Sequence, residues 1–135
     1  MSTYAPRVAR ALDLIDEIES VLTAAEVPNA DLVTVTLDDR EIDKTAHQQH
    51  GVIVVSPAPK VTYPGPGVRH FEWQIVIVCK ATGNPLDAWI RLDELLGTLE
   101  QHFEFGEATP GQRPRPDGQS SLPGYTITLA EEDQN

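Results

Sequence analysis

The sequence predicts a single α+β domain, a two-layer sandwich in which a small, mostly antiparallel sheet of about four strands carries two amphipathic helices on one face. Three observations lead to this fold class. The chain of 135 residues has the usual size of one domain. One stretch near its start and another after its middle have helical apolar spacing, and β-type stretches lie between and after them.

The two predicted helices cover residues 6–25 and 85–103. Pro6 suits a first helical turn, and Pro28 prevents the first helix from continuing. Asn84 is a typical N-cap, and Pro85 follows it at the first helical position. The expected inner stripes are Val8, Ala11, Ile15, Ile18, Leu22 and Ala25 in the first helix, and Leu86, Trp89, Leu92, Leu96, Leu99 and Phe103 in the second.

Four stretches are predicted as strands: 31–37, 51–56, 68–80 and 125–129. The stretch 68–80 is apolar on both faces beyond Gln74, which favours a central strand paired with 51–56 in an antiparallel hairpin. We therefore expect one shared core made of Trp73, Ile75, Ile77, Trp89, Leu96 and Leu99.

The remaining segments are predicted to be irregular. Residues 38–50 form a polar loop, 57–67 a proline-rich hairpin connection, 107–123 a long mobile loop and 131–135 an acidic tail. Compact domains rarely keep long irregular segments unless these make contacts, so we expect an interaction protein. The alternative is that the segments are tolerated insertions.

Within the two proline-rich segments, four residues are the expected contact residues. Tyr63 and Pro64 lie in the first segment, and Arg113 and Arg115 form the only close basic pair in the C-terminal half. The two arginines are natural partners for the acidic face of a neighbouring subunit.

No residue pattern predicts catalysis, a metal or a cofactor. His47 and His50 lie close in sequence, but a structural zinc site needs about four ligands and none of the others is nearby. Cys79 is the only cysteine, which excludes an intrachain disulfide, and its apolar strand favours a buried thiol over a reactive one. We expect no enzyme activity.

The charge balance excludes two classes of partner. Ten Lys and Arg against 21 Asp and Glu give a net charge of −11, and the basic residues form no stripe. Nucleic-acid binding and adsorption to anionic membranes both need clustered cations. The apolar runs are too short for a transmembrane helix and the N-terminus has no signal core, so a soluble, unexported protein is expected.

The whole-chain order resembles the tail terminator family of long-tailed bacteriophages, also called minor tail or tail completion proteins. The matching segments are RVARALDLIDEIESVL, VIVVSPAPKVTYPGPGVRHFEWQIVIVC, NPLDAWIRLDELLGTLEQHF and GYTITLA. The most specific fragment is a long aromatic-containing strand, a Gly-Asn-Pro turn and a helix with Trp89. The proline-rich segment 107–123 departs from the family pattern by its length.

The resemblance implies a structural virion protein that forms a ring, usually a homohexamer. The ring caps the growing tail tube and offers its other face to the head-tail connector protein, so the major tail tube protein is also a partner. DNA passes through without specific binding, and the family pattern supplies no catalytic residue. The implied location is the head-proximal tail end in the virion, and the host cytoplasm during assembly.

Two other roles remain open at this point. A head completion or neck protein would share the virion context but contact the portal side. A non-viral interaction module, or an enzyme with an unrecognised site, would have no such context. A gene position just before the major tail tube gene would favour a terminator.

Overall fold

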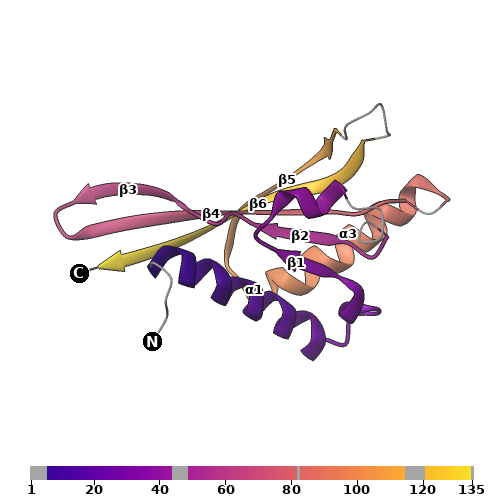
Figure 1. The fold of residues 1–135 in the computed structure, drawn as a ribbon, viewed down its shortest axis with the longest axis horizontal. Helices are drawn as coiled ribbons and strands as arrows, with labels where there is room; N and C mark the ends of the chain where they lie inside the picture. Colours follow the sequence, from indigo (N-terminus) through magenta and orange to yellow (C-terminus); the bar gives the residue numbers. More distant parts are fainter. Residues whose placement is uncertain (1–5, 44–48, 82, 115–120, 135) are drawn as a thin grey trace.

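The structure is a computed structural model that describes residues 6–43, 49–81, 83–114 and 121–134, with the backbone alone at 43 and 132–134. The described part is α+β, with two α-helices and a mixed sheet of six strands (Figure 1). The elements in chain order are α1 (Pro6–Ala24), the 3-10 turn η1 (Ala30–Leu32), β1 (Thr34–Thr36), the 3-10 turn η2 (Asp39–Asp43), β2 (Val52–Val55), β3 (Lys60–Gly65), β4 (Val68–Val78), α3 (Pro85–Glu100), β5 (Phe105–Arg113) and β6 (Leu122–Gln134).

The sheet is larger than predicted, and β4 is its centre. The strand order is β1-β2-β4-β6-β5, and β3 also pairs with β4. Only β1 and β2 run parallel among the described pairings, so the expected antiparallel pairing of β2 with β4 is confirmed. All of β4 pairs with β6, from Val68 opposite Gln134 to Val78 opposite Gly124.

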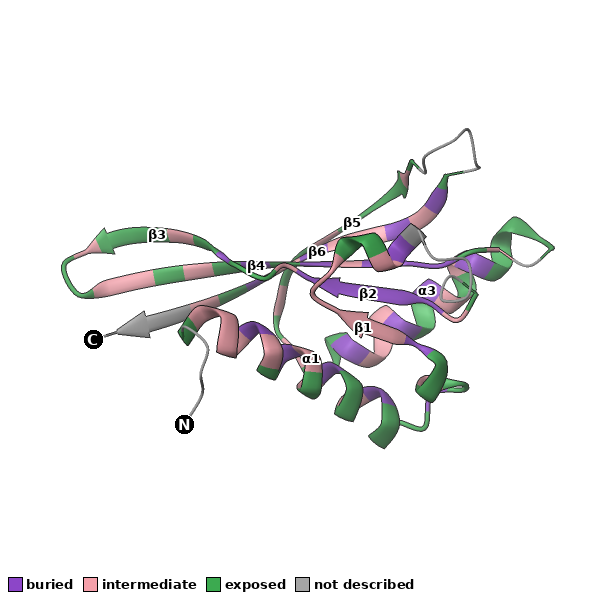
Figure 2. Ribbon diagram, viewed as in Figure 1, coloured by how far each residue is buried: buried purple, intermediate pink, exposed green. Residues whose placement is uncertain are grey.

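The main core is one buried cluster to which α1, α3 and the sheet all contribute residues. Trp73, Ile75 and Ile77 have no exposed surface, as expected from their alternation along β4. Figure 2 shows this buried zone along β2 and the middle of the sheet. The helical members are Ala11, Leu14, Ile18 and Leu22 from α1, and Ala88, Leu92, Leu95 and Leu99 from α3, with Trp89 and Leu96 partly buried against them.

A second, smaller cluster was not predicted. Ile42, on η2, is fully buried against Val52, Val54, Val78 and Leu122. The polar loop predicted over 38–50 is therefore partly wrong, because one isolated apolar side chain holds η2 onto the sheet. Residues 44–48, which include His47, lie outside the described residues.

The irregular segments predicted over 57–67 and 107–123 are largely strands. Residues Lys60–Gly65 form β3 and Phe105–Arg113 form β5. Both are edge strands, which tolerate proline because one side of the backbone has no ladder partner. The segment 107–123 is thus not a mobile loop over its described part, although 115–120 lie outside it.

The acidic tail predicted over 131–135 is also a strand as far as Gln134. It continues β6 and pairs with the start of β4, as in Glu131 opposite Phe71. Conversely, the strand predicted over 31–37 is shorter, since only Thr34–Thr36 pair and the residues before them form η1.

The predicted helix starts are confirmed. Helix α1 begins at Pro6, and the Asn84 side chain caps α3 by accepting the Leu86 backbone N–H at 3.0 Å. This cap fixes where α3 begins, directly after the loop that follows β4.

Candidate functional site

The most distinctive feature of the molecule is a projecting three-stranded ribbon, which we call the arm. It consists of residues 60–65 of β3, 68–72 of β4 and 130–134 of β6. The arm extends along the longest axis of the molecule, away from the end where α3 begins (Figure 1). Within the described residues neither outer strand of the arm has a further pairing neighbour. Two open strand edges are therefore available for contacts with another chain.

The base of the arm is tied to α1 by a network of three side chains. Glu131 accepts a hydrogen bond from the indole N–H of Trp73 at 2.8 Å. Arg10 on α1 donates to both carboxylate oxygens of Glu131, from Nη2 at 2.6 Å and from Nε at 3.1–3.2 Å. Because these bonds are charge-assisted and one donor is buried, the network holds β6 firmly over α1.

The network shifts the pKa values of both charged groups. Hydrogen bonding to Glu131 raises the pKa of Arg10 above its usual value. Burial alone would raise the pKa of Glu131, but the hydrogen bonds from Arg10 and Trp73 and the charge of Arg10 outweigh burial and lower it. The ion pair is therefore stable at neutral pH.

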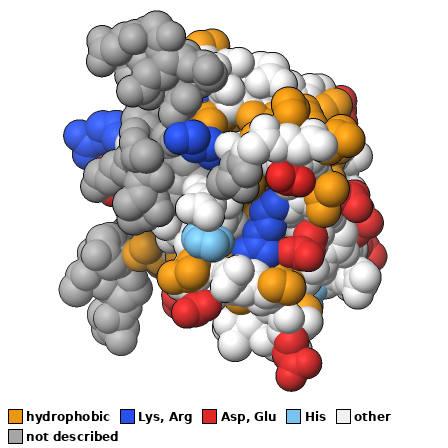
Figure 3. All heavy atoms as spheres, turned by 90° about the vertical axis from the view of Figure 1, so that its right-hand side faces the viewer, with side chains coloured by type: hydrophobic (Ala, Val, Ile, Leu, Met, Phe, Trp, Pro, Cys, Tyr) orange, Lys and Arg blue, Asp and Glu red, His pale blue; other side chains and the backbone are white. Residues whose placement is uncertain are grey.

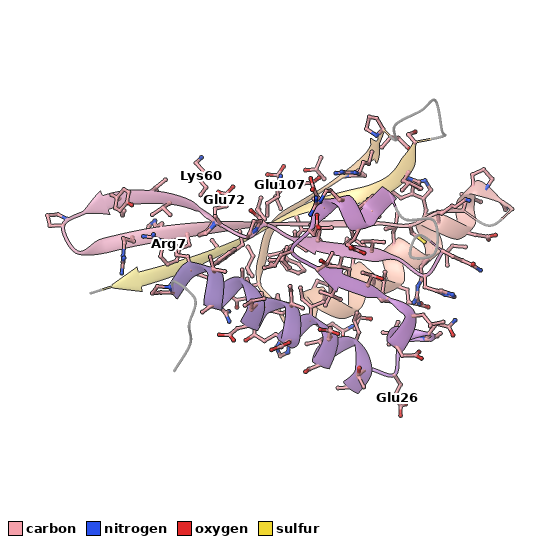
Figure 4. All side chains as sticks on the ribbon, in the orientation of Figure 1. Arg7, Glu26, Lys60, Glu72 and Glu107 are labelled. Carbon is pink, nitrogen blue, oxygen red and sulfur yellow. The ribbon has the colours of Figure 1, made fainter. Side chains whose placement is uncertain are left out.

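Beyond the base of the arm, two arginine side chains lie close to the aromatic ring of Phe71. The guanidinium of Arg7 lies 5.5 Å from the ring centroid of Phe71, and that of Arg69 lies 5.9 Å from it. Figure 4 shows Arg7 between α1 and the arm, with Lys60 and Glu72 extending from the opposite side. The side of the arm near α1 is thus covered, and the other side is open to solvent.

Tyr63 and Pro64 lie in a bulge of the arm. Thr62 pairs with His70 and Gly65 with Val68, so β3 has one residue more than β4 over this interval. A bulge leaves the extra residue without a ladder partner, which accommodates Pro64. Tyr63 is 68% exposed, although a side chain of this size usually buries much of its surface. Both predicted contact residues are therefore accessible.

The predicted basic pair is not brought to the arm. Arg113 ends β5, is one-third exposed and lies 3.9 Å from Asp39 on η2 within the same chain. Arg115 lies outside the described residues. The end of β5, where Arg113 lies, and the turn from β3 into β4 are at opposite ends of the sheet (Figure 1).

A second exposed feature was missed by the sequence reasoning. Leu86 and Ile90, one turn apart on α3, are 62% and 64% exposed, and we call this pair the α3 stripe. The expected inner position of Leu86 is wrong, because the buried face of α3 starts at Ala88. The signal that could have found the stripe is Ile90, a large apolar residue outside the predicted helical spacing.

The α3 stripe and the turn of the arm are at opposite ends of the molecule. Helix α3 begins at one end of the longest axis, and β3 turns into β4 at the other (Figure 1). Figure 3 looks onto the α3 end and shows hydrophobic side chains at the surface there, next to acidic ones.

Three features of the described side chains bear on chemistry: possible metal ligands, the Cys79 thiol and a hollow between the helices. Among the described side chains, no three His, Cys, Asp or Glu residues are placed to share a metal ion. Cys79 is buried as expected, and burial raises the pKa of its thiol despite the charge of Arg91. A hollow of about 660 Å³ between α1 and α3 is lined by small, polar and acidic side chains. Its lining also includes Ser20, Thr98 and His102.

Two further findings concern membranes and relatives. No α-helix in the ranges that the structure describes is both long and apolar enough to cross a bilayer. No family model matches the chain, and a search of curated proteins finds no significant match. The function must therefore be inferred from the arm, the α3 stripe and the layout of the chain.

Proposed function

We propose that this chain is a structural virion protein, a tail terminator that forms a ring on the end of a tail tube. The observation that carries the proposal is the arm, a rigidly based ribbon with two open strand edges on a body that otherwise covers its core. An open, projecting strand edge promotes aggregation of a monomer, whereas in an assembly it can pair with a neighbouring chain. The resemblance of the chain layout to tail terminators agrees with this role.

In the proposed ring, both helices cover one face of the sheet as a second layer, and the arms connect neighbours. A homohexamer is the expected stoichiometry. The tail tube protein meets one face of the ring, and the head-tail connector protein meets the other. The net charge of −11 suits a channel through which DNA must slide without being held. The protein acts by contact and has no enzymatic step.

The acidic charge of the chain also suits a ring that assembles only on a tube end. Association costs translational and rotational freedom, and two copies of this acidic chain repel each other. A tube end that binds several copies at once raises their local concentration. The free protein is then a monomer or small oligomer, and the ring closes on the tube.

The test is assembly of the cognate tube protein with and without this chain, followed by measurement of tube lengths by electron microscopy. We expect tubes of uncontrolled length alone and stopped growth when the chain is added. An unchanged length distribution would contradict the proposal. Binding at the portal side without any effect on tubes would instead identify a head completion or neck protein.

A further inference from the structure

We propose that a pocket between η2 and the sheet binds an organic carboxylate, meaning a carboxylate group on a short aliphatic stem. Arg113 is the residue that holds the carboxylate, and we call the site the Arg113 pocket. It has a volume of about 400 Å³, within the usual range of small-ligand sites. The inference goes beyond the proposed function and does not depend on it.

The floor of the Arg113 pocket is apolar and is fixed by the sheet. Val54 on β2 and Val76 on β4 are paired neighbours, so their side chains lie side by side. Both alternate with residues of the main core, which places them on the sheet face opposite the helices. Ile42 is fully buried against the same cluster and holds η2 in place as one wall. A hydrocarbon stem on this floor displaces water from apolar surface, which is favourable.

Arg113 supplies the charge of the site. Its Nε is buried and has no hydrogen-bond acceptor among the described residues. Its Nη2 lies 3.9 Å from a carboxylate oxygen of Asp39, which is too far for a hydrogen bond. A buried donor without an acceptor is unfavourable, so this guanidinium calls for an acceptor from outside the described chain. Since no hydrogen bond to a described residue holds the side chain, a rotation about its bonds suffices to turn the Nε–Nη2 edge into the pocket.

The acidic residues of the pocket do not reverse this preference. Asp38 is already engaged by Arg40, whose Nε and Nη2 each donate to one of its carboxylate oxygens at 2.9 Å. The Asp39 side chain is 69% exposed, so water screens its charge. A guanidinium has five N–H donors. Arg113 can therefore keep Asp39 as a neighbour while it donates two parallel hydrogen bonds to a ligand carboxylate.

Titration of the full chain with hexanoate, followed through backbone amide signals in NMR spectra, tests the site. We expect saturable shifts that cluster at Val54, Ser56 and Gln74, which line the pocket. Affinity should rise from acetate through butyrate to hexanoate, by up to about fourfold for each buried methylene. Hexanamide has the same shape without the charge, and it should bind at least about tenfold more weakly. Shifts that do not saturate, or equal binding of hexanamide, would overturn the inference.

Two substitutions should move the affinity in opposite directions. Arg113→Gln should weaken hexanoate binding at least about tenfold, because it removes the charge-assisted donors. Asp39→Asn should strengthen binding about two- to fivefold, because it removes a competing carboxylate. A purely structural role of Arg113 does not predict this gain, which also keeps the test decisive if Arg113→Gln fails to fold.

The matched control is Lys60→Gln, which removes one positive charge from the arm, away from the Arg113 pocket. It should leave the dissociation constant for hexanoate unchanged. A loss as large as that of Arg113→Gln would show that only net charge matters and would contradict the site. So would an unchanged constant in a folded Arg113→Gln protein, or weaker binding to Asp39→Asn.

Two sources supply the same chemistry, a free short-chain acid and a glutamate side chain of another protein. A blocked Gly-Gly-Glu-Gly-Gly peptide carries the carboxylate on a protein backbone, and its glutamine counterpart is the neutral match. Binding of the glutamate peptide at least as tightly as butyrate assigns the pocket to a protein partner, and weaker binding assigns it to a free acid. Binding of neither hexanoate nor the peptide would overturn the inference. None of these measurements uses tubes, so their failure leaves the proposed function untouched.

Discussion

Removing the Glu131 carboxylate is the most informative perturbation of the arm, because this group joins Arg10 on α1 to Trp73 on β4. Glu131→Ala leaves the indole N–H of Trp73 buried without its acceptor, which costs about 1–3 kcal/mol. The lost ion pair adds at most about 1 kcal/mol, because Arg10 and Glu131 are 33% and 26% exposed. We expect a total loss of about 1–4 kcal/mol in the free energy of unfolding.

The assay is equilibrium unfolding in urea, with two comparison variants. Arg10→Ala keeps the bond between Trp73 and Glu131 and should cost about 1 kcal/mol. Glu17→Ala removes only the longer contact of Arg10 at 3.4 Å and should cost less than about 0.5 kcal/mol. A loss for Glu131→Ala no larger than that for Glu17→Ala would refute the role of the network at the base of the arm.

The same network predicts a pH dependence. The pKa of Glu131 is lower in the folded chain than in the unfolded chain, where it is about 4.3. Its stabilising effect is therefore complete above that value and is lost as the pH falls through the folded pKa. The difference in unfolding free energy between wild type and Glu131→Ala should shrink from neutral pH to about pH 3. A difference that stays constant or grows on acidification would contradict this.

Three further predictions concern the core, a helix end and the thiol. Ile77→Ala should cost about 2–5 kcal/mol in urea unfolding because Ile77 is fully buried, whereas Ile90→Ala should cost under about 1 kcal/mol; equal losses would refute the assigned faces. Glu26→Gly should raise the melting temperature by relieving about 1 kcal/mol of strain at its φ of 56°, and an unchanged or lower melting temperature would contradict this; Figure 4 shows that its side chain points away from the molecule. Cys79 should react with thiol reagents slowly in the native protein and quickly in urea, since burial raises its pKa; fast native labelling would count against its burial.

The helices could be predicted from sequence because their signals are local. The apolar spacing of α1, the cap at Asn84 and the proline that follows it all act within one or two turns. The alternation around Ile75 and Ile77 likewise identified the central strand, since burial on both faces leaves a continuous apolar run.

The edge strands could not be predicted because their pairing is not local. Pro64 is accommodated by a bulge, and Pro110 lies on β5, which pairs on one side only. The end of β6 is acidic and has no strand propensity of its own. It is ordered by the pairing of Glu131 through Gln134 with β4 and by Arg10, which is 121 residues from Glu131 in sequence.

Part of the candidate site could be predicted from the sequence, and part depended on the packing of the folded chain. Tyr63 and Pro64 stood out as an aromatic and a proline in an apparently irregular segment, and both are exposed on the arm. Arg113 was selected for its charge, but it lies near Asp39 of its own chain. The α3 stripe was missed because helical spacing alone assigns Leu86 to the inner face, and only the packing of Ala88 and Leu92 decides otherwise.

The central claim is that this chain forms a ring at a tube end, and imaging its position tests that claim most directly. The chain would be labelled with gold at its N-terminus, added to assembled cognate tubes and viewed by electron microscopy. The account predicts label and ring-shaped density at one end of each tube. Label along the tube walls, or no label on the tubes at all, would contradict it.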